Sequence, residues 1–290
     1  MVSNRKKKIL VTGATGQQGG ALARLLLEKN HEVYALTRNT NSSAAQDLKN
    51  QGANLIKGDL DNPDSLEQAV NSVDSIFLMG TPFEDGTEAE TRRGKMMADI
   101  AKDKGVEHLV YSSVANADKN TGIAHFDSKY KVEQHIKNLG IPYTIIGPTF
   151  FMENLLGSGL QQGQLALPLS PSSVLQQSAL ENIAEFSALV LKDRKLFLGK
   201  RIDIASDEVT GDRAAKVLSD VLGRRIRYIQ VPLERVSQMN EDMARMYEWY
   251  DIIGTGIDIA SLHQAYPKVK WHSFEEWAKS KNWAGIIRQW

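Results

Sequence analysis

The sequence of 290 residues contains no cysteine. This absence excludes disulfide bonds, cysteine-ligated zinc, thiol-based redox sensing and a thiolate nucleophile. Any response to redox state would therefore act through a bound cofactor. An excess of charge is also absent, because 35 basic residues balance 35 acidic ones. No overall field draws the chain to nucleic acid or to a membrane surface, so we expect neither as a direct partner.

Long apolar runs are lacking as well. No run approaches the roughly 18 apolar residues of a membrane-spanning helix, and we see no signal peptide at the N-terminus. We therefore expect a cytoplasmic protein. The six histidines include no His-x-x-x-His pair, so we expect no metal site. Apolar residues nevertheless make up 42% of the chain, which is enough for a globular core.

A short apolar strand followed at once by a glycine-rich turn stands near the start of the chain. Residues 9–11 predict a buried strand, residues 21–28 predict a helix, and glycines recur every third residue between them. Gly13 permits a tight turn, Gly16 lets the backbone approach a pyrophosphate, and Gly19 lets the helix pack closely on the strand. Unpaired N–H groups at the helix N-terminus then bind the pyrophosphate. This order predicts a dinucleotide-binding βαβ unit.

Strand and helix patterns alternate through the first half of the sequence. Near-continuous apolar strands that alternate with helices are typical of a parallel sheet covered on both faces. We therefore expect an α/β fold, a Rossmann doubly wound parallel sheet with a smaller mixed α/β C-terminal lobe. The predicted strands lie at 33–36, 54–56, 75–79, 109–112 and 143–146, and the predicted helices at 44–50, 63–70 and 87–104.

The amino-acid composition of the sequence changes after Pro148. Residues 157–178 are rich in Gly, Gln, Ser and Pro, which predicts a long loop. Two short strand patterns, at 201–205 and 227–231, are expected in the smaller lobe. We place the nucleotide-binding domain at 1–156 and the substrate or partner lobe at 157–290, with the chain free to weave between the two.

The second strand ends in a segment that has no acidic residue. NAD-specific sites place a carboxylate there to bind the ribose 2′-hydroxyl. Arg38 stands there instead, and a guanidinium can bind a 2′-phosphate by paired hydrogen bonds. We therefore predict NADP(H) rather than NAD(H) as the cofactor. Asp59, after the third strand, either accepts from the adenine amino group or caps the loop that follows it.

Candidates for proton transfer lie after the fifth strand. Hydride-transferring enzymes of this fold usually keep a Tyr-x-x-x-Lys pair there, but the match in this chain, Tyr266 and Lys270, lies near the C-terminus and is interpreted as chance. The expected region holds His125 and Lys129, which share one helix face if the helix has begun by His125. Either His125 donates a proton, or it packs under the cofactor while Lys129 holds the ribose. Both are our candidate catalytic residues.

With these motifs the sequence resembles the NmrA-like family, an atypical branch of the short-chain dehydrogenase/reductases, over nearly its whole length. Within the family it is similar to the NADPH-sensor members. The resemblance rests on Thr12–Gly20, Thr37–Asn39, Gly58-Asp59, His125-Phe126 with Lys129, Phe151–Leu156, Ala205–Gly211, Leu222–Arg224, Asp242–Tyr247 and Phe274–Trp277.

The resemblance implies a set of cofactor-binding residues. The glycine turn would cradle the pyrophosphate, with Gly13, Ala14, Thr15, Gly16, Gln17, Gln18 and Gly19. The 2′-phosphate would lie on Arg38, Asn39, Thr40, Asn41 and Ser42, and the adenine on Asp59 and Leu60. Gly80, Thr81 and Arg92 would line the middle of the cofactor, Lys129 the nicotinamide ribose, and Phe151, Met152, Glu153 and Asn154 would close over the nicotinamide.

Two functions remain open from the sequence. In the first, the protein is a redox sensor or regulator that binds NADP(H) and passes the NADPH/NADP⁺ balance to a protein partner or through a homodimer. The missing tyrosine favours this hypothesis. In the second, the protein is an NADPH-dependent reductase of a small conjugated carbonyl compound, a quinone or a dye. Family members that are reductases also lack the tyrosine, so its absence does not separate the two.

Overall fold

The structure is a computed structural model and describes residues 6–71, 73–157 and 159–288. Its contacts divide the chain into two compact units, and both are discontinuous. Unit 1 comprises residues 1–118, 125–147 and 183–202, and unit 2 comprises residues 119–124, 148–182 and 203–290. The units therefore do not follow the continuous ranges 1–156 and 157–290. Residues 183–202 return to unit 1 after the chain has entered unit 2.

Unit 1 is built on a seven-stranded sheet in the order β10-β6-β5-β4-β1-β2-β3. Neighbouring strands from β6 to β3 run parallel. This is the Rossmann order, and the point where it reverses lies between β1 and β4. The strands are β1 (Lys8–Val11), β2 (Glu32–Thr37), β3 (Asn54–Lys57), β4 (Ser75–Met79), β5 (His108–Ser112), β6 (Tyr143–Pro148) and β10 (Arg201–Ile204).

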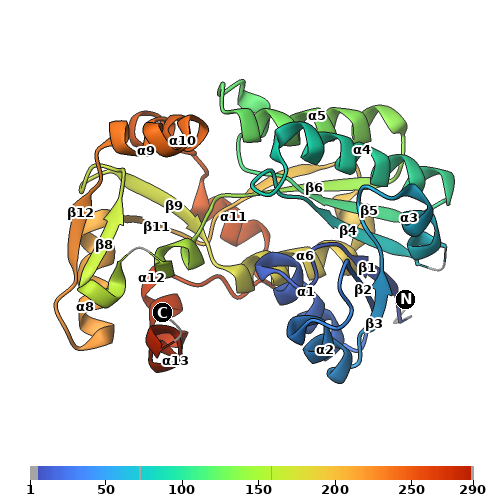
Figure 1. The fold of residues 1–290 in the computed structure, drawn as a ribbon, viewed down its shortest axis with the longest axis horizontal. Helices are drawn as coiled ribbons and strands as arrows, with labels where there is room; N and C mark the ends of the chain where they lie inside the picture. Colours follow the sequence, from blue (N-terminus) through green and yellow to red (C-terminus); the bar gives the residue numbers. More distant parts are fainter. Residues whose placement is uncertain (1–5, 72, 158, 289–290) are drawn as a thin grey trace. The chain divides into compact units, whose positions relative to one another are not determined.

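Helices cover both faces of this sheet, as the sequence predicted. In Figure 1, α4 and α5 lie on one side of the sheet, and α1 and α2 on the other. A buried cluster joins α3, α4 and α5 to the strands through residues such as Leu66, Met97 and Ile136. The helices are α1 (Gln17–Glu28), α2 (Ser43–Asn50), α3 (Pro63–Val70), α4 (Gly86–Asp103), α5 (Ala124–Leu139), α6 (Leu180–Lys192) and α7 (Arg194–Phe197).

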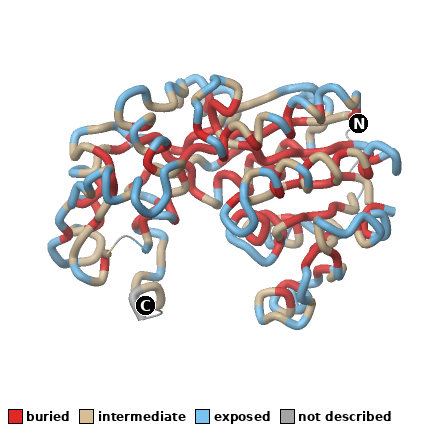
Figure 2. Tube along the Cα trace, turned by 45° about the horizontal axis from the view of Figure 1, so that its top comes forward, coloured by how far each residue is buried: buried red, intermediate tan, exposed pale blue. Residues whose placement is uncertain are grey.

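The central strands β1, β4, β5 and β6 are largely buried because apolar residues occupy both of their faces, whereas the edge strand β3 is partly exposed. Ile9, Leu10 and Val11 of β1 have no exposed surface, and Figure 2 shows long buried stretches of this kind in unit 1. The predicted strands of the first 150 residues are confirmed. The first helix differs from the prediction, because α1 begins at Gln17 rather than at Ala21. Gly19 and Gly20 therefore belong to the helix and not to the turn.

Unit 2 has smaller sheets and the remaining helices. In one sheet β9 pairs antiparallel with β11 and parallel with β7, and in the other β8 pairs parallel with β12. Its strands are β7 (Phe150–Phe151), β8 (Gln164–Leu167), β9 (Val174–Ser178), β11 (Asp207–Thr210) and β12 (Arg227–Gln230). Its helices are α8 (Gly211–Leu222), α9 (Leu233–Met239), α10 (Glu241–Ile252), α11 (Ile259–Ala265), α12 (Phe274–Ser280) and α13 (Trp283–Arg288).

The prediction of a long loop at 157–178 is wrong, because β8 and β9 lie within it. Leu165 and Leu167 alternate with less buried residues in β8, which is a half-buried strand pattern that the polar composition concealed. In β9 the side chain of Gln176 is buried and binds the Ile257 carbonyl at 2.8 Å. Buried glutamines are possible here because hydrogen bonds replace the lost water.

The strand predicted at 201–205 is present, but its expected place in the smaller lobe is wrong. The structure places β10 (Arg201–Ile204) at the edge of the seven-stranded sheet, next to β6, and not in the smaller lobe. The pattern at 227–231 is confirmed as β12. Within the described ranges, none of the helices is both long enough and apolar enough to cross a bilayer.

Candidate functional site

The glycine turn after β1 has the geometry that its sequence predicted. Gly13 has a φ of +60°, a conformation that side chains other than glycine rarely adopt. A Cβ on Gly19 would lie 2.4 Å from the Gly13 carbonyl oxygen and 2.7 Å from the Thr12 oxygen. Backbone atoms cannot move aside cheaply, so only glycine lets α1 pack this closely on the end of β1.

The turn opens on a cavity of about 430 Å³ at the carboxyl ends of the strands of unit 1. Gly16, the residue that precedes α1, and Gln17, its first residue, both line this cavity. The N-terminus of α1 therefore offers the N–H groups and the positive dipole end that bind a pyrophosphate. The cavity lies where β1 and β4 meet, which is the ligand-binding position in sheets of this topology.

Eleven of the predicted cofactor-binding residues come together in this cavity. They are Gly13, Thr15, Gly16, Gln17, Arg38, Asn39, Ser42, Asp59, Leu60, Gly80 and Thr81. They follow four different strands, β1, β2, β3 and β4, so only the parallel sheet makes them neighbours. The hydroxyl of Ser42 also caps α2, because it accepts a hydrogen bond from the Ala45 N–H.

Four other predicted residues, Ala14, Gln18, Thr40 and Asn41, are not among those that line the cavity. Ala14 is fully buried, and Gln18 donates from Nε2 to the Ser112 hydroxyl at 2.6 Å. Ser112, at the end of β5, is itself buried. The Thr40 carbonyl accepts from Gln46 at 2.6 Å, and the Asn41 N–H donates to the Asn39 side chain at 2.9 Å.

Arg93 lines the cavity, whereas the predicted Arg92 does not. Arg93 donates from Nε to Asp61 at 2.9 Å and also pairs with Asp85 at 2.6 Å. Arg92 pairs with the same Asp61 at 2.7 Å and is more than half exposed. The hydrogen bonds from Arg93 and Arg92 lower the pKa of Asp61 to about 2, and the bond to Asp61 raises the pKa of Arg93.

The sequence held a signal for Arg93 that its prediction missed. On α4 the buried residues include Glu90, Gly94, Met97 and Ala101, which form one stripe at helical spacing. Arg93 is one residue from Gly94 and three from Glu90, so it borders this stripe, whereas Arg92 is turned further away. The positions of the residues around the α4 helix would therefore have predicted Arg93, and not Arg92, as the arginine that faces the cavity.

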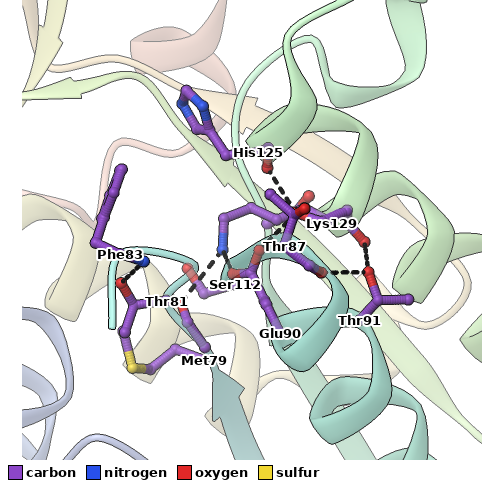
Figure 3. Close-up of polar contacts among 12 residues, drawn as sticks. Met79, Thr81, Phe83, Thr87, Glu90, Thr91, Ser112, His125 and Lys129 are labelled. Carbon is purple, nitrogen blue, oxygen red and sulfur yellow. Dashed lines mark hydrogen bonds and ion pairs between the residues drawn. The ribbon is translucent and has the colours of Figure 1, made fainter. Parts of the chain in front are cut away.

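The candidate catalytic Lys129 is held by a carboxylate that the sequence did not identify. The structure begins α5 at Ala124, so His125 and Lys129 do share a helix as expected. Lys129 Nζ lies 2.5 Å from the Glu90 carboxylate and 3.2 Å from the Gly80 carbonyl oxygen (Figure 3). The other oxygen of Glu90 accepts from the Ser128 hydroxyl at 2.6 Å. Lys129 itself is not among the residues that line the cavity, but its partners Glu90 and Gly80 are.

His125 is packed against aromatic rings. It is 6% exposed, and its ring centroid lies 5.7 Å from that of Phe83 and 4.9 Å from that of Phe126. In Figure 3 its ring points away from the amino group of Lys129. Of the two interpretations of His125, this packing agrees with the one in which the ring fills space. The pair Tyr266 and Lys270 lies beyond the end of α11 at Ala265.

The predicted residues Phe151, Met152, Glu153 and Asn154 belong to unit 2. Met152 is fully buried, and Glu153 accepts from the Trp277 indole N–H at 2.7 Å and from the Leu180 N–H at 3.2 Å. Burial raises the pKa of Glu153. These contacts give Glu153 a structural role within unit 2, and the contact of this segment with nicotinamide stays a prediction. Among the described residues, no group of three or more His, Asp or Glu side chains could hold a metal ion.

The strand order, the glycine turn and the cavity at the switch point together define a protein with the NAD(P)-binding Rossmann fold. The chain belongs to the NmrA-like family, whose model matches residues 5–278. The fold and the family both agree with the resemblance seen in the sequence.

Two relatives cover almost the whole chain. An NmrA-like family domain-containing protein of Dictyostelium discoideum is 27% identical, over 96% of this chain and 98% of its own. An NAD(P)H azoreductase of Xenophilus azovorans is 28% identical, over 94% of this chain and 97% of its own.

Among solved structures, NmrA, a negative transcriptional regulator in complex with NADP, superposes with a TM-score of 0.81 at 21% identity and covers 98% of each chain. The same regulator in complex with NAD also gives a TM-score of 0.81. At this identity the likeness establishes the fold. These neighbours bind NADP or NAD in their structures.

Proposed function

We propose that this protein binds NADP(H) in the cavity of unit 1 and acts as a sensor or regulator of the NADPH/NADP⁺ balance. The pyrophosphate lies on the N-terminus of α1, and the adenine lies beside Asp59 and Leu60. The 2′-phosphate lies on Arg38, which lines the cavity together with Asn39 and Ser42. Residues 36–42 contain no carboxylate, which favours the phosphorylated cofactor.

The observation that carries the regulatory role is the state of Lys129. Its amino group is paired with the buried Glu90 carboxylate and bonded to the Gly80 carbonyl. A lysine held in this way is poorly placed to assist proton transfer to a substrate. His125 is buried among aromatic rings. The cavity therefore supports cofactor binding more directly than it supports a reaction.

A sensor needs one further property. Because a ligand shifts an equilibrium only through its different affinity for two states, NADPH and NADP⁺ must bind with different strength to two forms of the protein. The two forms would differ in shape or in association with a protein partner or a second copy of the chain.

The second candidate is an NADPH-dependent reductase of a small conjugated carbonyl compound, a quinone or a dye. It is favoured by the azoreductase relative, which matches nearly the whole chain. In this case bound NADPH would supply the hydride, and Lys129 would have to leave Glu90 to supply a proton or to polarise a carbonyl.

Absorbance of NADPH in the presence of quinones, enones, azo dyes and triarylmethane dyes separates the two candidates. The sensor predicts tight NADPH binding without turnover, and a change of mass in solution between the NADPH and NADP⁺ forms. Turnover that is lost in Lys129→Met with Glu90→Gln, but kept in the control Lys131→Met, would establish the reductase instead. The paired substitution is used because Lys129→Met alone leaves a buried carboxylate without its cation. Lys131 is an exposed lysine on the same helix.

A further inference from the structure

An acidic side chain reaches Arg38 from a distant loop. The Glu84 carboxylate, in the loop between β4 and α4, accepts a hydrogen bond from the Arg38 guanidinium at 2.9 Å. The two residues are 46 positions apart in the sequence, and both line the cofactor cavity. The segment after β2 has no acid of its own, so the fold supplies from elsewhere the carboxylate that the sequence lacks there.

We infer that Glu84 is a specificity-determining residue that competes with the 2′-phosphate of the cofactor for Arg38. Through this competition the site binds NAD(H) as well as NADP(H), with a smaller preference for NADP(H) than Arg38 alone would give. The inference rests on the proposed function, because it concerns the same cavity and the same cofactor.

The ion pair is of a kind that a ligand can replace. The side chains of Arg38 and Glu84 are 63% and 53% exposed, so water screens their attraction and the pair is weak. A phosphate dianion binds a guanidinium more strongly than one carboxylate does, because it carries more charge. NADP(H) therefore displaces Glu84 from Arg38, but it must do so against a competitor that is already in place.

The displaced carboxylate remains close to the phosphate because its loop is held at both ends. The Gly80 carbonyl accepts from Lys129 at 3.2 Å, and Asp85 pairs with Arg93 at 2.6 Å. The Gly86 N–H also donates to the Pro82 carbonyl at 2.8 Å, which closes the turn around Glu84. Because Glu84 cannot move far, its charge still repels the phosphate after the exchange.

NAD(H) meets the opposite situation. It brings a neutral 2′-hydroxyl, which needs an acceptor, and a carboxylate beside the ribose is the group that NAD-specific sites use for this purpose. Glu84 therefore lowers the affinity for one cofactor and leaves unchanged or raises the affinity for the other. Other acids near the cavity have partners of their own: Asp61 and Asp85 pair with Arg93, and Glu90 pairs with Lys129. Asp59, which also lines the cavity, accepts from the Asp61 N–H at 3.0 Å.

The test compares Glu84→Gln with the matched control Glu88→Gln. Both replace an exposed glutamate by its neutral isostere, but Glu88 does not line the cavity. Dissociation constants for NADPH and NADH are measured by calorimetry on the full chain. We expect Glu84→Gln to tighten NADPH binding about two- to fivefold, the upper part of the range for one surface ion pair. Binding of NADH to Glu84→Gln should tighten less than twofold or become weaker. The control Glu88→Gln should change each dissociation constant less than twofold.

A third arm tests whether the effect passes through Arg38. In an Arg38→Ala background, Glu84→Gln should change the NADPH constant no more than Glu88→Gln does. Three results would overturn the role of Glu84: an equal gain in affinity for NADPH and NADH, a gain that Glu88→Gln reproduces, or a gain that persists in the Arg38→Ala background. Each of them leaves the proposed function standing. If the wild-type protein binds neither nucleotide, the proposed function fails, and the inference fails with it.

Discussion

Replacement of Lys129 by methionine would leave the Glu90 carboxylate buried without its cation. The Glu90 side chain is 1% exposed and that of Lys129 is 11% exposed, so water cannot take the place of the lost amino group. Removal of one partner from a buried ion pair costs about 3–5 kcal/mol. We expect Lys129→Met to lower the free energy of unfolding by about 3 kcal/mol, the lower end of this range, because Lys129 keeps slight access to water.

The reverse substitution should cost less. Glu90→Gln retains a side chain that can accept from the Ser128 hydroxyl, which Glu90 binds at 2.6 Å. Lys129 would still donate to the Gly80 carbonyl. We expect a loss of about 1.5 kcal/mol, the lower end of the range for a hydrogen bond to a charged group. With both substitutions no uncompensated charge is left, so the double variant should be more stable than Lys129→Met alone.

Urea unfolding measures these differences through the midpoint at constant m. The sum of the losses in the two single variants should exceed the loss in the double variant by about 2 kcal/mol. A coupling of this size is typical of residues in direct contact. Lys131→Met, on the exposed side of α5, should change stability by less than about 0.5 kcal/mol. Losses that add to within about 0.5 kcal/mol would refute the ion pair as a stabilising unit.

Three further outcomes follow from the geometry of unit 1. Gly19→Ala should destabilise the protein by about 3 kcal/mol or more and weaken nucleotide binding, because the new Cβ would lie 2.4 Å from the Gly13 carbonyl oxygen. An unchanged thermal unfolding temperature would contradict this close packing. Arg38→Ala should weaken NADPH at least tenfold more than NADH in a binding titration, and equal weakening would remove the basis for naming NADP(H). Burial lowers the pKa of His108 from 6.5 to about 3, so its neutral form stabilises the fold above pH 6.5 and this contribution is lost as the pH falls from 6.5 towards 3. When the pH falls from 7 to 5, the free energy of unfolding of His108→Gln should therefore drop less than that of the wild type, and the difference should reach about 2 kcal/mol. Equal drops in urea unfolding would show that His108 is not the group concerned.

Prediction from the sequence succeeded where structure depends on neighbours in the chain. The strand at 8–11, the glycine turn and the helix that follows are local features, because tight turns and helix starts depend on residues a few positions apart. The same holds for α3, which begins at Pro63 after the capping residue Asn62. The loop predicted at 157–178 failed because strand formation there depends on partners in β11 and β12, which lie later in the sequence.

The sequence by itself determined the dinucleotide-binding turn, the alternation of strands with helices and the presence of Arg38 at the end of β2. Only the tertiary structure decided which charges meet. Glu84 reaches Arg38 across 46 residues, Glu90 holds Lys129 across 39, and β10 joins the edge of the large sheet. The reason is physical. Backbone geometry and residue spacing act over a turn or two, whereas two distant charges meet only when the order of strands has brought the loops or helices that carry them side by side.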